Sequence, residues 1–348
     1  MTSSDIELTG EQREFRDAVR AFAEKVVAPV AEERRCTETF PLEVVRRMGE
    51  LGLFGLPFPE RYGGLDGDFA TFCLCVEELA RVDRSVAATL LAAVCLGANT
   101  LFRLGAEEQK ERWLVPMCRG RILGSLALAE PGRDMGARAV RATARLGGGE
   151  WVIDGTKTSV ANSGTPLSEV CLVVARTDGG GTSVILVPYG SPGFAVGPAR
   201  READVHAADV QAVDVQAADV HAADVHDLAL DGCRVPEGNL LGGRGSVDRE
   251  LLETLDDERI AIAALSVGSA RTCLEGLGPG PAGPAPAGPA PAELEAAVEG
   301  ARLVYLGAAR LRDRGLPYEV EAATAELRSS EMQGLLTVRD LGFPAVEL

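Results

Sequence analysis

Residues 255–267 read Leu-Asp-Asp-Glu-Arg-Ile-Ala-Ile-Ala-Ala-Leu-Ser-Val, so three acidic side chains directly precede an apolar run. The helical pattern resumes at Arg249 and continues through this run, so Asp256, Asp257 and Glu258 are expected near the start of a helix, at the head of its apolar part. Carboxylates in the first turn of a helix interact favourably with the helix dipole. Taken alone, Glu258 therefore fits an ordinary first-turn glutamate.

The composition of the chain indicates a globular protein without a membrane-spanning segment. It has 348 residues, and a hydrophobic fraction of 46% predicts two or three domains. A formal charge of −17 argues against nucleic acid and anionic membranes as partners. We find no basic and apolar leader at the N-terminus and no run of about eighteen apolar residues, and therefore expect a cytoplasmic protein. The eight cysteines are expected to be buried thiols.

The first third of the chain has the texture of helices. Thr9 and Gln12 fit a capping box, and apolar residues then recur at helical spacing. Helical patterns also begin at Pro41 and cover Phe69–Val82 and Ser85–Leu104, with Gly105 expected as a left-handed cap.

From Ile122 the texture changes to short apolar or alternating runs separated by glycine. This pattern predicts an antiparallel β-domain. Its expected strands are Leu123–Leu128, Ala139–Leu146, Trp151–Ile153, Val170–Ala175 and Ser183–Pro188.

Two segments interrupt this organisation. Residues 203–227 repeat the unit Ala-Asp-Val-His/Gln-Ala and hold all three histidines, His206, His221 and His226. A metal site is conceivable there, but an expanded, exposed loop of polar turns explains the strict period better, and we assign no metal. Residues 276–291 are almost purely Gly, Pro and Ala, which predicts a semi-extended linker.

The order of these segments resembles the acyl-CoA dehydrogenase family, in its isovaleryl and long-chain type. The resemblance implies an α+β multidomain fold. Its parts are an N-terminal α-helical domain at 1–121, a middle antiparallel β-domain at 122–243 with the repeat 203–227 inserted, and a shortened C-terminal α-helical domain at 244–348 with the linker 276–291. The motifs that carry it are Phe54 to Gly64, Gly105 to Trp113, Ala129-Glu-Pro131, Asp154-Gly-Thr-Lys157, Arg234-Val-Pro236 and Leu255 to Ala264.

The resemblance implies α,β-desaturation of an acyl thioester. A carboxylate removes the α-proton while a hydride leaves the β-carbon for the N5 atom of FAD. Glu258 aligns with the catalytic glutamate of this type. Asp134, Asp256 and Arg259 are expected to contact the substrate, although Arg259 also fits a surface pair with Glu253 or Asp256. The chain is expected to stop before the position of the family's alternative glutamate.

The expected flavin contacts are Leu126, Leu128, Ala129, Ser159 and Ala161, and here the chain departs from the family. Ala129 stands where the family has threonine, Gly132-Arg-Asp134 replaces Gly-Ser-Asp, and Ser159-Val-Ala-Asn162 replaces Trp-Ile-Thr-Asn. Each lost hydroxyl bond costs about 0.5–1.5 kcal/mol, so three or four losses are enough to turn tight FAD binding into weak binding.

Three interpretations follow. The leading one is an FAD-dependent dehydrogenase of an acyl-CoA or an acyl-carrier protein, with an electron-transferring flavoprotein as acceptor. The second is a catalytically impaired half-site subunit of a hetero-oligomer, because the linker 276–291 replaces the family's Arg-x-x-Phe-Gly contact with a neighbouring subunit. The third is a flavin-free acyl-binding or interaction protein. A homo- or hetero-oligomer is expected in the first two cases.

Overall fold

The computed structural model describes residues 8–31, 39–132, 140–178, 180–199, 225–276 and 289–338. By its internal contacts the chain divides into two compact units. The helical unit comprises Met1–Glu33, Gly67–Ala88 and Asp256–Leu348, and the sheet unit comprises Arg34–Asp66 and Thr89–Leu255. The sequential order of helices, strands and helices confirms the expected α+β class. The division into three sequential domains at 121 and 243 stays a prediction.

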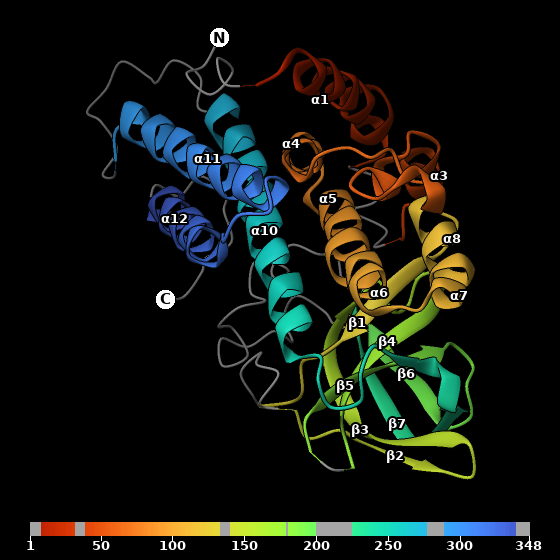
Figure 1. The fold of residues 1–348 in the computed structure, drawn as a ribbon. Coiled ribbons are helices and arrows are strands. Elements are labelled where there is room, and N and C mark those ends of the chain that lie inside the picture. The colour runs from red at the N-terminus through yellow and green to blue at the C-terminus, as the bar shows by residue number, and fades with distance from the viewer. Residues whose placement is uncertain are drawn as a thin grey trace. The chain divides into compact units, whose positions relative to one another are not determined.

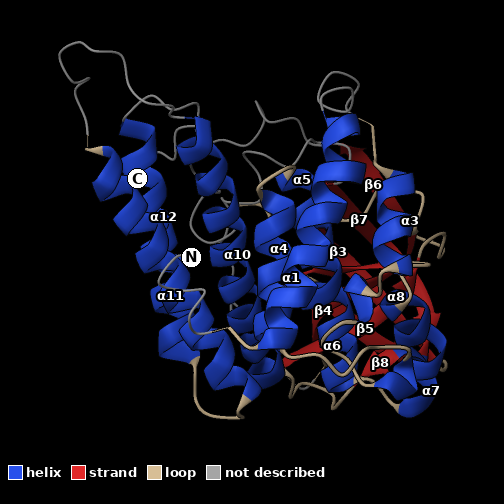
Figure 2. Cartoon of the chain, turned by 90° about the horizontal axis from the view of Figure 1, so that it is seen from above, coloured by secondary structure: helices blue, strands red, loops and turns tan. Residues whose placement is uncertain are grey.

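The helical unit is built on long helices. They are α1 (Gly10–Phe22) with a π-helical turn at Ala23–Val27, α4 (Phe69–Ala80), the start of α5 (Arg84–Leu91), most of α10 (Asp248–Gly276), α11 (Pro291–Asp313) and α12 (Glu319–Val338). Figures 1 and 2 both show α10, α11 and α12 side by side. The capping box at the start of α1 is confirmed, because Gln12 N donates to Thr9 Oγ1 and Thr9 N donates to Gln12 Oε1, each over 3.1 Å.

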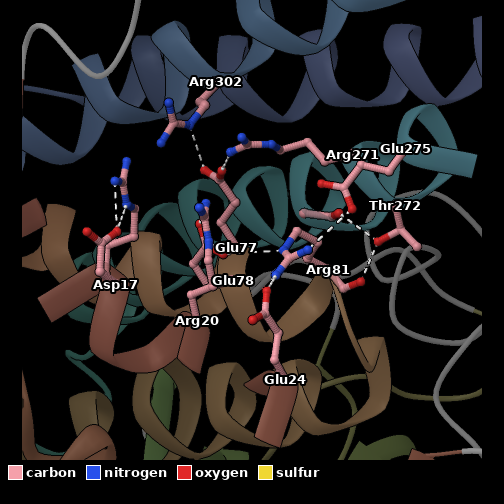
Figure 3. Close-up of polar contacts among 12 residues, drawn as sticks. Asp17, Arg20, Glu24, Glu77, Glu78, Arg81, Arg271, Thr272, Glu275 and Arg302 are labelled. Carbon is pink, nitrogen blue, oxygen red and sulfur yellow. Dashed lines mark hydrogen bonds and ion pairs between the residues drawn. The ribbon is translucent and has the colours of Figure 1, made fainter. Parts of the chain in front are cut away.

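Buried charges tie the helices of this unit together (Figure 3). The carboxylate of Glu77 on α4 is 1% exposed and accepts from Arg302 Nε on α11 over 2.9 Å. It also pairs with Arg271 on α10 and accepts from the Tyr305 hydroxyl. A side chain at Gly268 would meet the Glu77 carbonyl oxygen at 2.2 Å, so α10 and α4 cross in close contact at that glycine.

The sheet unit places short helices beside one large sheet. The helices are α3 (Leu42–Glu50), α6 (Asn99–Leu104), α7 (Glu107–Gln109) and α8 (Val115–Cys118), with π-helical turns at Ala92–Ala98 and Lys110–Leu114 and 3₁₀ turns at Leu53–Gly55, Glu60–Tyr62 and Glu237–Asn239. Gly97 lets the first π-helical turn approach β1, because a Cβ there would lie 2.5 Å from the Gly124 carbonyl oxygen.

Within the residues that the structure describes, the sheet has eight strands, seven of them in the order β6-β7-β3-β2-β4-β5-β8, while β1 pairs with β4. They are β1 (Leu123–Ala127), β2 (Thr143–Gly147), β3 (Glu150–Ala161), β4 (Ser168–Thr177), β5 (Thr182–Pro188), β6 (Phe194–Ala199), β7 (Val225–Pro236) and β8 (Leu240–Leu241). Residues 170–175 in β4 are all 0% exposed, as expected of a strand covered on both faces.

Four expectations need correction. The sheet is mixed, because β4 pairs in parallel with both β1 and β2. Gly105 follows α6 with an extended backbone, φ −71°, rather than as a left-handed cap. Glycine is needed here because there is no room for a side chain: a Cβ would lie 2.6 Å from the Leu101 carbonyl oxygen. Pro291 begins α11 instead of ending the linker, which suits a residue without an N–H.

The fourth correction concerns the end of the pentad repeat. Residues 201–224 lie outside the described part of the chain, but Val225, His226 and Asp227 form the start of β7. Val225 is only 8% exposed. The last unit of the repeat therefore ends inside the sheet and is not wholly a solvated turn, because pairing with β3 and β6 satisfies its backbone.

One stretch, Arg84–Leu104, is long and apolar enough to cross a membrane by length and composition alone. Its apolar window is 94% buried inside the structure, as in the core helix of a soluble protein. The described cysteines are not in disulfide bonds, and all except Cys273 are buried.

Candidate active site

The predicted catalytic glutamate lies well inside a helix. Helix α10 begins at Asp248, so Glu258 is in its third turn and not at its head, which corrects the first-turn reading. The dipole effect fades within the first turn and does not account for a carboxylate there. Glu258 is 5% exposed, Asp257 is 0% and Asp256 is 8%. Three consecutive buried carboxylates point in three directions around one helix, and each needs its own compensation.

Asp257 has a structural role. Its carboxylate accepts from Arg312 at 2.7 and 3.2 Å and from the Tyr318 hydroxyl at 2.8 Å. These bonds connect α10 to the end of α11 and the turn before α12. Asp257 is therefore fully engaged in holding the helical unit together and is not available for proton transfer.

Asp256 and Arg259, the predicted substrate contacts, are bonded to each other. Arg259 Nη1 donates to Asp256 Oδ1 over 2.8 Å, and Arg259 Nε lies 3.0 Å from Glu326 Oε2 on α12. Burial raises the pKa of Asp256, and the neighbouring Arg259 opposes that rise only in part. The expected partner Asp256 is confirmed, whereas Glu253 pairs with Arg103 and Arg249 instead.

The predicted cofactor residues lie in the sheet unit, where the end of β1 meets a bulge in β3. Leu126 and Leu128 are buried, whereas Ala129, Ser159 and Ala161 are partly exposed. Thr158 N donates to the Ala129 carbonyl oxygen over 3.0 Å, which places the two segments side by side. The side chains of Ala129, Ser159 and Ala161 are small, so the main chain lies close to the surface here. We call these two segments the β1–β3 edge (residues 126–129 and 158–161).

A bulge shapes this edge. The register between β3 and β7 shifts between Lys157 and Val160. Ser159 sits in the bulge with φ +52°, a left-handed conformation that is uncommon outside glycine. Asp227 on β7 accepts from both Thr158 Oγ1, at 2.8 Å, and Ser159 N, at 3.0 Å.

Beneath the edge lies an ion pair to which the motifs gave no role. Lys157 Nζ is 2.8 Å from Glu130 Oε1 and 3.1 Å from the Leu128 carbonyl oxygen, and Lys157 is 0% exposed. Burial raises the pKa of Glu130, but Lys157 and two backbone N–H groups outweigh it and lower the pKa overall. Burial is also the main reason that the pKa of Lys157 is lowered. A lysine at an inward strand position was the signal in the sequence, because such a charge requires a partner.

The remaining expected residues divide as follows. Glu258, Asp256 and Arg259 belong to the helical unit, and Leu126, Leu128, Ala129, Ser159 and Ala161 to the sheet unit. Asp134, His206 and His221 lie outside the described residues. Within the described ranges, no three His, Cys, Asp or Glu side chains are grouped so as to hold a metal ion.

Comparison with known proteins places this architecture. Residues 9–121 match the model for the acyl-CoA dehydrogenase N-terminal domain, and residues 125–218 match that for the acyl-CoA dehydrogenase middle domain. The chain belongs to the acyl-CoA dehydrogenase family. It is 34% identical to a probable acyl-CoA dehydrogenase of Bacillus subtilis over 341 residues, which covers 94% of this chain and 86% of that protein.

Two further relatives support the assignment of the chain to the acyl-CoA dehydrogenase family. A short-chain specific acyl-CoA dehydrogenase of Clostridium acetobutylicum is 33% identical, over 94% of this chain and 86% of its own length. The solved butyryl-CoA dehydrogenase of Megasphaera elsdenii superposes with a TM-score of 0.83 at 29% identity, covering 95% of this chain and 87% of that one. The family supports an oxidoreductase, while the roles of individual residues stay predictions.

Proposed function

We propose that this protein is an FAD-dependent acyl-thioester dehydrogenase in which Glu258 is the base. The observation that carries the proposal is the position of Glu258, a carboxylate only 5% exposed in the third turn of a long helix of an acyl-CoA dehydrogenase family member. Glu258 also aligns with the catalytic glutamate of the isovaleryl and long-chain type of this family, which supports its role as the base.

The β1–β3 edge supports FAD as the cofactor. Ala129, Ser159 and Ala161 are small and partly exposed, so a flat ring can approach the main chain closely. The ion pair between Glu130 and Lys157 fixes the segment behind this edge. The edge therefore has space for a flavin, with fewer side-chain hydroxyls than the family pattern. We assign Leu126, Leu128, Ala129, Ser159 and Ala161 to hold it.

In this proposal, bound FAD supplies the acceptor for the hydride that leaves the substrate β-carbon. Glu258 accepts the proton of the α-carbon on one of its carboxylate oxygens. Asp257 does not compete for this proton, because Arg312 and Tyr318 hold it as a structural anion. Arg259, 37% exposed and oriented by Asp256 and Glu326, offers a cation to the carrier part of the thioester.

The proposed substrate is an acyl-CoA or an acyl-carrier protein, and the proposed electron acceptor is an electron-transferring flavoprotein. The first test is the absorption spectrum of the purified protein, followed by anaerobic mixing with butyryl-CoA and with octanoyl-CoA. We expect two flavin bands, with bleaching of the longer-wavelength band by at least one thioester. A protein without bound flavin that also takes up no added FAD contradicts the proposal.

The alanines at 129 and 161 favour a second candidate, a half-site subunit that binds FAD firmly only beside a more complete homologous chain. Each lacks the hydroxyl donor of the family pattern. Titration of the isolated protein with FAD separates the two functions. Tight, stoichiometric binding rejects the half-site subunit, whereas binding that appears only on co-purification with a homologue supports it.

A further inference from the structure

The end of the pentad repeat reaches the proposed cofactor edge through Asp227. Asp227 is the last residue of the final repeat unit and the third residue of β7. The two residues before it pair with β3, His226 with Val160 and Val225 with Ala161. Its neighbour His226 is held as well, with Nδ1 2.9 Å from the Gly197 carbonyl oxygen. The position of Asp227 is therefore set by two neighbouring strands.

Asp227 binds β3 through one oxygen. Oδ1 accepts from Thr158 Oγ1 at 2.8 Å and from Ser159 N at 3.0 Å. A carboxylate that accepts from a backbone N–H forms a charge-assisted bond, which is stronger than a neutral one. Both donors lie in the bulge, so the carboxylate stabilises the local conformation in which Ser159 takes φ +52°.

The same bulge positions the rest of the β1–β3 edge. Thr158 donates its backbone N–H to Ala129 over 3.0 Å and its hydroxyl to Asp227. One residue thus connects Asp227 to the segment after β1. A change in the bulge would shift Ser159 and Ala161 together, because in a strand neighbouring side chains and N–H groups are fixed by a common register.

We propose that Asp227 is a positioning residue for the cofactor edge: it holds Ser159 in its left-handed conformation and thereby sets the β1–β3 edge for the flavin. The role toward flavin rests on the proposed function, whereas the clamp between Asp227 and the bulge does not. The last unit of the repeat is in this way part of the site, although the repeat reads as an exposed insertion in the sequence.

Two substitutions separate hydrogen bonding from charge. Asp227→Asn keeps an oxygen at the position that accepts both bonds, whereas Asp227→Ala removes it. Asp231→Asn is the matched control, because Asp231 is an exposed carboxylate four residues further along the same strand. A double variant combines Asp227→Ala with Ser159→Gly, because glycine adopts a positive φ at position 159 without strain.

The first readout is hydrogen exchange at the Ser159 amide in flavin-free protein. We expect faster exchange in Asp227→Ala, a smaller increase in Asp227→Asn, whose amide oxygen accepts both bonds without the charge, and wild-type exchange in Asp231→Asn. The second readout is the FAD dissociation constant, which we expect to rise about tenfold or more in Asp227→Ala and to recover in part in the double variant. The flavin absorption envelope should change only in Asp227→Ala.

The outcomes are distinct. Unchanged exchange in Asp227→Ala overturns the clamp itself. Faster exchange with unchanged FAD affinity overturns the positioning role while leaving the proposed function intact. Wild-type protein that binds no FAD overturns the proposed function and with it the role toward flavin, while the exchange data still decide on the clamp. If Asp227→Ala fails to fold, Asp227→Asn decides: faster Ser159 exchange with weaker FAD binding supports the positioning role, whereas unchanged exchange, or faster exchange with unchanged FAD affinity, contradicts it.

Discussion

Lys157 and Glu130 form a buried ion pair, with Nζ and Oε1 2.8 Å apart, that joins strand β3 to the segment after β1. Glu130 also accepts from the backbone N–H groups of Arg141 and Ala142 at 2.8 and 2.9 Å. Through this one carboxylate the segment after β1 is bonded both to β3 and to the residues that precede β2, and it supports the proposed cofactor edge from behind.

Removing the positive charge of Lys157 should destabilise the protein strongly near neutral pH. Lys157→Met leaves Glu130 buried without a counter-charge, which typically costs about 3–5 kcal/mol. Chemical denaturation at pH 7 measures the loss. Arg145→Met is the control, because Arg145 and Asp154 form an exposed pair in the same sheet, and such pairs contribute about 1 kcal/mol or less. A similar, small loss in both variants would contradict the importance of the buried pair.

The same pair predicts a pH dependence. The pKa of Glu130 is lower in the folded protein than in the unfolded chain, so its contribution to stability is complete above the ordinary glutamate value of about 4.3. The contribution is lost as the pH falls below that value and through the lower folded pKa. In Lys157→Met the buried glutamate is free to become neutral on acidification. The difference in stability between wild type and variant should therefore narrow between pH 7 and pH 4, and a constant difference would speak against this cause.

Replacing the buried Glu77 of the helical unit should also destabilise the protein strongly. Glu77→Gln leaves the cations of Arg302 and Arg271 without their shared carboxylate (Figure 3), and we expect a loss of about 3–5 kcal/mol. Glu275→Gln is the matched control, since Glu275 pairs with Arg81 but its side chain is 57% exposed. Thermal unfolding of both variants checks this. Equal melting temperatures would mean that packing alone holds α4, α10 and α11 together.

Replacing the proposed base Glu258 should slow flavin reduction by the thioester strongly while flavin and thioester stay bound. Glu258→Gln keeps the shape of the side chain but removes the proton acceptor, and loss of a general base slows the reaction by about 10²–10⁴. The rate of anaerobic flavin bleaching by the active thioester is the measurement. Asp248→Asn serves as control, because Asp248 is exposed at the start of the same helix. Bleaching as fast as wild type in Glu258→Gln would remove Glu258 from the mechanism.

Most of the pentad repeat should be dispensable for folding. Strand β6 ends at Ala199 and β7 begins at Val225, so after deletion of Asp204–Ala223 the residues 200–203 and 224 remain between the two strands. That is a hairpin connection of ordinary length. We expect an almost unchanged melting temperature, and a clear loss when the deletion extends through Asp227. A loss of several degrees in the shorter deletion would show that the repeat itself is structural.

The sequence by itself determined the family, the order of helices and strands, and the start of the first helix. Periodicity, the Thr9 and Gln12 pair and short motifs are local signals, and local signals survive in the sequence. It also pointed to Glu258, Asp256 and Arg259 by resemblance, and to a pair of Arg259 with either Glu253 or Asp256.

Only the tertiary structure decided the rest. The burial of Glu258 in the third turn of α10 is one such feature, because the helical pattern from Arg249 indicates where the helix starts but not what packs against it. The Lys157 and Glu130 pair and the bonds from the bulge to Asp227 join residues far apart in the chain. No periodic pattern encodes such contacts, since a buried charge requires a partner but does not specify which strand will bring it.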